Sequence, residues 1–170
     1  MQYDTTLAQA AYDLAAKWDQ SRSTSDLQFK ESDLEGFNSN QIVVFLETLT
    51  SKYPPLPSSH LIYLAEAYKV SKTHNAEIRL RFYHLIFVEP TSEASKKFAP
   101  EAADWVTGSG SGIVIGRMKF CRDVFRDVYK VDQELAVSEF TKAKESFHPI
   151  ARKMIEKVSV YTMSVGAFSR

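Results

Sequence analysis

The sequence has little of what marks several large classes of protein. A single cysteine, Cys121, excludes a framework of disulfide bonds and favours a reducing compartment. Only 6 Gly and 6 Pro among 170 residues exclude a collagen-like fibre and a low-complexity linker. No apolar run approaches the roughly 18 residues of a membrane span, and the first residues lack the basic and apolar regions of a signal peptide. We therefore expect a cytoplasmic protein without a membrane span.

Neither sign of charge is in excess. The 21 Lys and Arg residues balance 21 Asp and Glu residues, and the isoelectric point is about 6.9. Binding to nucleic acid or to anionic membranes generally needs a basic excess, so this balance argues against both. Basic side chains nevertheless outnumber acidic ones within residues 117–170, and this region is where an anion would be attracted.

Apolar residues recur with a helical period along almost the whole chain. The pattern predicts eight helices. The first follows Asp4 and extends to Trp18, and the others run from Asn38 or Ser39 to Pro54, from Ser58 or Ser59 to Tyr68, from Asn75 to Pro90, from Thr91 to Val106, over 120–128, over 135–147 and over 150–155. Short turns between helices of this length favour antiparallel neighbours. We therefore predict one all-α domain over residues 1–157, a two-layered helical superhelix (an α-solenoid of the armadillo/HEAT kind) of about eight or nine helices. Residues 108–112 are predicted to form a flexible Gly/Ser loop, and the tail 158–170 is left unassigned.

The chain offers no self-sufficient set of catalytic residues. None of its four histidines lies in an H-E-x-x-H pattern or another helical ligand pair, and Cys121 has no second cysteine with which to hold zinc. The loop Gly108–Gly112 follows a predicted helix and lacks the Gly-Lys-Ser/Thr ending of a phosphate-binding loop. Trp18 and Trp105 fall on apolar stripes, which is typical of core residues. We expect no catalytic residue and no metal or other cofactor in this chain.

The segment Gly116-Arg117-Met118-Lys119-Phe120 is the exception, because it combines two cations with a predicted helix start. In an extended backbone Arg117 and Lys119 would point to the same side. The free N–H groups of a helix start would add to their attraction for an anion. Arginine offers a flat pair of donors to a carboxylate, and lysine adds a compact charge beside it. The alternative interpretation is a pair of solvated cations at a helix entry.

Several of these segments together resemble a known family. They are Gly116-Arg117-Met118-Lys119-Phe120, Phe125-Arg126-Asp127, His148-Pro149, Tyr3-Asp4-x-x-Leu7 with Trp18, Leu56-Pro57, and Asn75-x-Glu77-Ile78-Arg79. In their order along the chain these segments resemble the C-terminal domain of leukotriene A-4 hydrolase and its aminopeptidase relatives. The resemblance covers roughly residues 3–157, and Gly-Arg-Met-Lys-Phe is its most specific element. The tail from Val158 to Arg170 does not match the family's usual ending.

The resemblance implies a function for the chain as part of a larger enzyme. The family's members are three-domain zinc aminopeptidases, some of which also hydrolyse a lipid epoxide, and their zinc site lies in a central domain that is absent here. Their C-terminal domain closes one side of the active-site cleft. The family's carboxylate-binding arginine and lysine fall on Arg117 and Lys119. The implied partners are the catalytic and N-terminal domains of the same enzyme and the carboxylate of a peptide or lipid-epoxide substrate.

A second function of another class stays open at this point. Met1 at the start of a fold-complete helical domain favours a free-standing scaffold that binds a partner protein through a concave helical face. The two hypotheses differ in what they predict for the native protein, which is either one part of a large zinc enzyme or a small zinc-free chain.

Overall fold

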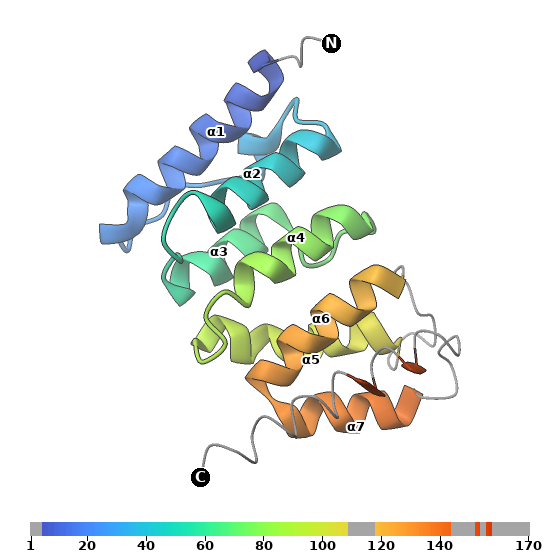
Figure 1. Cartoon of the computed structure of the whole chain (residues 1–170). Helices are drawn as coiled ribbons and strands as arrows, with labels where there is room; N and C mark the ends of the chain where they lie inside the picture. Colours follow the sequence, from blue (N-terminus) through green and yellow to red (C-terminus); the bar gives the residue numbers. More distant parts are fainter. Residues whose placement is uncertain (1–4, 109–117, 144–151, 154–155, 158–170) are drawn as a thin grey trace. The chain divides into compact units, whose positions relative to one another are not determined.

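The computed structural model describes residues 5–108, 118–143, 152–153 and 156–157, and within them the chain is helical (Figure 1). These residues form seven α-helices and two short 3₁₀ helices, and no strand occurs among them. The all-α prediction is confirmed. The predicted count of eight or nine helices is too high for the described part of the chain. Ile150, Met154 and Ile155, on which the eighth helix was predicted, lie outside the described residues.

The chain divides into two compact units, Met1–Ala94 and Ser95–Arg170. The first unit holds α1 (Thr5–Gln20), the 3₁₀ helices η1 (Ser21–Ser23) and η2 (Glu31–Leu34), α2 (Ser39–Ser51), α3 (Ser58–Tyr68) and α4 (Ala76–Ile86). The second holds nearly all of α5 (Glu93–Thr107), together with α6 (Met118–Val131) and α7 (Gln133–Ala143). The prediction of a single domain over residues 1–157 stays a prediction.

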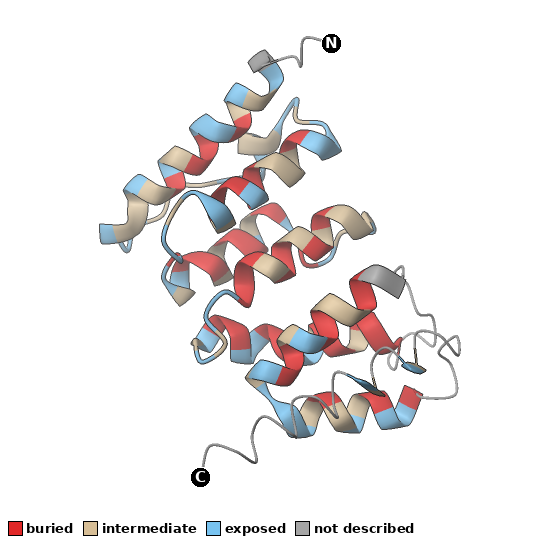
Figure 2. Cartoon of the chain, viewed as in Figure 1, coloured by how far each residue is buried: buried red, intermediate tan, exposed pale blue. Residues whose placement is uncertain are grey.

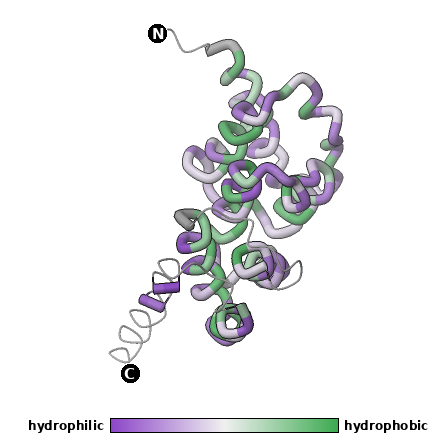
Figure 3. The backbone as a smooth tube through the Cα atoms, turned by 90° about the vertical axis from the view of Figure 1, so that its right-hand side faces the viewer, coloured by the Kyte–Doolittle hydropathy of each residue, from purple (hydrophilic) through white to green (hydrophobic). Residues whose placement is uncertain are grey.

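The first unit is built around α2, which packs against α1 on one side and α4 on the other (Figure 1). Each of these helices carries both buried and exposed positions (Figure 2). The fully buried large side chains include Trp18, Phe45, Leu46, Leu49, Leu64, Phe82 and Tyr83. Hydrophobic and hydrophilic residues are interspersed along each helix (Figure 3), as expected of helices that bury one face. Burial of each of the large side chains named above contributes about 1.5–3 kcal/mol to the stability of the fold.

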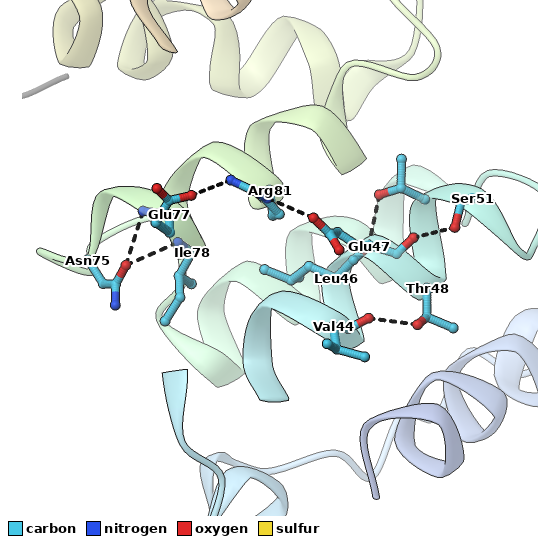
Figure 4. A network of polar contacts seen from close by, with 10 residues as sticks. Val44, Leu46, Glu47, Thr48, Ser51, Asn75, Glu77, Ile78 and Arg81 are labelled. Carbon is cyan, nitrogen blue, oxygen red and sulfur yellow. Dashed lines mark hydrogen bonds and ion pairs between the residues drawn. The ribbon is translucent and has the colours of Figure 1, made fainter. Parts of the chain in front are cut away.

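Two asparagines start helices as the sequence predicts. The Asn38 side chain accepts a hydrogen bond from the backbone N–H of Gln41 at 2.9 Å, and the Gln41 side chain accepts one from the N–H of Asn38. Asn75 caps α4 by accepting from the N–H groups of Glu77 and Ile78 (Figure 4). Both asparagines satisfy N–H groups that a helix start would otherwise leave without a partner.

The predicted cap of α3 is wrong. Ser58 and Ser59 lie inside the helix, and the residue before it is Pro57, which makes no side-chain cap bond. Pro57 favours a helix start in a different way, because its ring holds φ at −54°, near the helical value. The Ser58 hydroxyl instead accepts a hydrogen bond from the backbone N–H of Ala94 at 3.2 Å. This serine thus links the start of α3 to the start of α5.

A charged network joins α2 to α4 on the surface of the first unit (Figure 4). Arg81 donates to Glu47 at 2.9 Å and to Glu77 at 2.5 Å. Burial lowers the pKa of Arg81, but its hydrogen bonds and charge attraction with Glu47 and Glu77 outweigh this effect and raise it overall. The guanidinium therefore stays charged and fixes the two helices relative to each other.

Candidate functional site

The residues that the sequence singles out lie at the start of α6, in the second unit. This helix begins at Met118 and packs along α7. Phe125 of α6 meets Phe140 of α7 edge to face, with ring centroids 5.8 Å apart. Phe120, Val124 and Val128 of α6 are also buried. The apolar stripe that predicts this helix is thus the face that packs against the rest of the unit. This packing holds α6, and with it the helix start, in one orientation within the second unit.

The two predicted carboxylate-binding cations fall on either side of the helix boundary. Arg117 lies outside the described residues, directly before α6. Lys119 is the second residue of α6, and its side chain lies outside what the structure describes. Lys119 therefore belongs to the first turn, where backbone N–H groups lack helical partners. The helix begins at Met118, two residues before the predicted stripe, so Met118 and Lys119 are helical rather than extended. The argument from an extended backbone therefore does not hold for Lys119, and the arrangement of the two side chains stays a prediction.

Cys121, two residues further along α6, is a buried thiol rather than a nucleophile. Its side chain is 2% exposed, and its sulfur lies 3.9 Å from the backbone oxygen of Val106 in α5. Burial raises the pKa of this thiol to about 11, so the reactive thiolate is scarce at neutral pH. Cys121 acts as a small apolar side chain at the contact between α5 and α6.

Three of the four histidines lie within the described residues, and they differ in burial: His74 is exposed, His84 half-buried and His60 buried. His60 is buried, and its Nε2 lies 2.8 Å from the backbone oxygen of Ser21, to which it donates as the N–H tautomer. His148 lies outside the described residues. Among the residues that the structure describes, no three His, Cys, Asp or Glu side chains come together as metal ligands would.

No described helix is both long and apolar enough to cross a membrane.

One surface hollow was not predicted from the sequence. It has a volume of about 410 Å³ and lies between α1 and α2, lined by Tyr12, Val44, Glu47, Thr48, Ser51 and Lys52. Five of the six lining residues lie within residues 44–52, and Tyr12 of α1 is brought to them by the packing of α1 on α2. The hydroxyls of Thr48 and Ser51 donate to backbone oxygens of their own helix. Both hydroxyl protons are thus held by backbone oxygens rather than by a side-chain base.

The sequence matches the family described as "Leukotriene A4 hydrolase, C-terminal" over residues 37–158. It is 36% identical to leucine aminopeptidase 2 of Aspergillus niger over 156 residues, which are 92% of this chain and 24% of that protein. It is 35% identical to leucine aminopeptidase 2 of Neurospora crassa, with 92% of this chain and 21% of that protein covered. The chain thus spans about a quarter or less of the length of these relatives.

The fold is similar to that of a solved enzyme. A structure of native yeast leukotriene A4 hydrolase matches 94% of this chain and 27% of its own, with a TM-score of 0.76 and 28% identity. The matched part of each relative is therefore a segment of a longer polypeptide. These similarities agree with the all-helical architecture and with the resemblance read from the sequence motifs.

Proposed function

The chain belongs to the family of leukotriene A4 hydrolase C-terminal domains, and on this premise we propose that it serves as that domain in a zinc aminopeptidase. The match over residues 37–158 carries the proposal. In this role the chain closes one side of an active-site cleft and is not catalytic alone. Its partners are the catalytic and N-terminal domains of the same enzyme, and its substrate is a peptide or a lipid epoxide with a free carboxylate.

Zinc chemistry in this proposal belongs to the part of the enzyme outside this chain. A bound zinc ion would supply a Lewis acid and an activated water. The residues of this chain contribute binding and orientation instead. Arg117 and Lys119 hold the carboxylate at the far end of the substrate and so set its register relative to the reacting bond.

The start of α6 supports this role for the two cations. Lys119 lies in the first helical turn, and Arg117 directly precedes it. The helix start favours negative charge, both through its free N–H groups and through the helix dipole. An arginine in this place offers a carboxylate two parallel hydrogen bonds. The anchoring of α6 by Phe125 and Phe140 holds the backbone of this turn in place.

The proposal is tested in the full-length enzyme that contains this chain. We expect Arg117→Ala to lower kcat/KM for tripeptides with a free carboxylate by about 10- to 150-fold, the equivalent of one lost charge-assisted hydrogen bond. The same variant should lose much less with tripeptides whose C-terminus is an amide. The measurement is the ratio of kcat/KM for the two substrates, compared between wild type and variant.

Arg126 supplies a matched control, because it is an exposed arginine on the same helix. Arg126→Ala should leave both substrates unaffected. Arg117→Lys keeps the charge but loses the flat pair of donors, so its loss should lie between those of wild type and Arg117→Ala. Equal losses for free and amidated peptides in Arg117→Ala would contradict the carboxylate role.

A further inference from the structure

A long connection in the first unit covers the helices without contributing a buried residue. We call residues 24–37 the strap, which joins η1 to the Asn38 cap of α2 and includes η2. No residue of the strap is buried. It nevertheless lies over α1 and α3, whose residues Trp18 and Leu64 are fully buried. The strap is therefore a covering layer rather than part of the core.

An aromatic stack provides the first attachment. The ring of Phe29 in the strap lies parallel to the ring of Trp18 in α1, with centroids 3.9 Å apart and planes 10° apart. Tyr63 and Tyr68 of α3 contact the same tryptophan, at centroid distances of 6.2 and 5.7 Å. Trp18 is 0% exposed in this arrangement. Phe29 covers one of its two faces, so removal of the strap would expose that face to water.

Two tyrosine hydroxyls provide the next attachments. The Tyr63 hydroxyl lies 2.7 Å from the backbone oxygen of Phe29 and 3.1 Å from that of Leu27, and it shares its single proton between them. The Tyr68 hydroxyl donates to Asp33 at 2.9 Å and accepts from the indole N–H of Trp18 at 3.1 Å. Trp18 thus contributes to both kinds of attachment.

The remaining bonds of the strap are local or exposed. Its backbone N–H groups at Asp33, Glu35 and Phe37 donate to oxygens three residues earlier, within the strap itself. The ion pair of Lys69 with Glu31 measures 2.6 Å, but both side chains are about 65% exposed, and such pairs contribute little. Among the described residues no backbone-to-backbone hydrogen bond ties residues 25–37 to a helix of the core.

We propose that the strap is a flap that opens as one unit while the helices stay folded, and that Phe29 on Trp18 is its latch. Segments with few buried contacts and local hydrogen bonds open with less free energy than the core. Because the aromatic stack and the tyrosine bonds all converge on Trp18 and α3, they release together. Opening uncovers the Trp18 face and frees the Tyr63 hydroxyl. This inference does not depend on the proposed function.

Amide hydrogen exchange of the 170-residue chain tests the flap. The hydrogen-bonded amides of Asp33, Glu35 and Phe37 should be protected at least about 100-fold less than core amides of α2, with little dependence on denaturant. Phe29→Ala should raise the exchange rates of Asp33 and Glu35 by about 10-fold, because loss of such an aromatic contact raises the equilibrium constant for opening by about tenfold. Core amides of α2 should change by less than about twofold.

Tyr63→Phe keeps the ring and removes only the hydroxyl, so it carries the test if Phe29→Ala does not fold. It should raise exchange at Asp33 and Glu35 by about 3- to 10-fold, although Tyr63 bonds to neither residue. Glu31→Gln is the control within the strap, with an expected change below about twofold. Protection of the strap equal to that of α2, or variants that leave Asp33 and Glu35 unchanged, would overturn the proposal.

Discussion

Cys121 shows how burial of one side chain makes stability depend on pH. Its pKa is raised to about 11 in the folded chain, whereas an unfolded thiol loses its proton near pH 9. Between these pH values the unfolded state binds fewer protons than the folded state. The contribution of this thiol to the free energy of unfolding is therefore fully present below about pH 9 and is lost as pH rises towards 11. We expect the free energy of unfolding to fall by about 2–3 kcal/mol between pH 9 and 11 from this group alone. Urea unfolding across this range measures the slope.

Cys121→Ala isolates the contribution of the thiol. Burial also raises the pKa of Tyr68 far above its usual range, so a further fall above about pH 10 is expected in both proteins. The quantity to compare is therefore the difference in slope between wild type and Cys121→Ala from pH 9 to 10. An identical slope in both would mean that the thiol ionises equally easily in the folded and unfolded chains.

For single residues, the sequence predicts which side chains are buried better than it predicts which side chains contact one another. Trp18 and Trp105 were predicted to be core residues from their place on apolar stripes, and both are buried. The ring that stacks on Trp18 was not predicted, since Phe29 belongs to a segment without helical period. Such a contact depends on how the chain folds back on itself, and the spacing of apolar residues does not predict it.

The helix cap can be tested with two neighbouring asparagines at the start of α2. Asn38 caps the helix, whereas Asn40 is an exposed residue within it. Asn38→Ala should lower the free energy of unfolding by about 1 kcal/mol, because the N–H of Gln41 loses its acceptor. Asn40→Ala should have no effect or stabilise slightly, since alanine is the better helix former. Thermal or urea unfolding of both variants measures the difference, and equal effects would argue against the cap.

The elements were predictable where a local signal exists. Asparagines before apolar stripes predict the starts of α2 and α4 correctly. The prediction of a serine cap for α3 is wrong, because Pro57 precedes the helix and makes no side-chain cap bond. The end of α4 was placed too late, at Pro90, because apolar residues continue past Ile86 into the following turn. The apolar stripe of α6 predicts the helix but places its start two residues late, at Phe120 instead of Met118. The relative orientation of Arg117 and Lys119 stays a prediction.

The whole native protein is the scale at which the two function hypotheses separate. Relatives of this chain are several times longer than the segment it matches. We therefore expect an antibody raised against this chain to capture from its source a species several times larger than 19.3 kDa, with about one bound zinc. Size-exclusion chromatography with light scattering and metal analysis of the captured protein measures both quantities.

Each quantity excludes a different alternative. A zinc-free species of 19.3 kDa, or a simple multiple of it, would mean that this family's domain acts alone as a helical scaffold. A large species without zinc would keep the domain in a longer chain but remove the metal chemistry from the proposal. Only a large species with zinc makes the peptide test of Arg117 meaningful, because a carboxylate held at α6 has a role only if a reacting centre lies within reach of the same substrate.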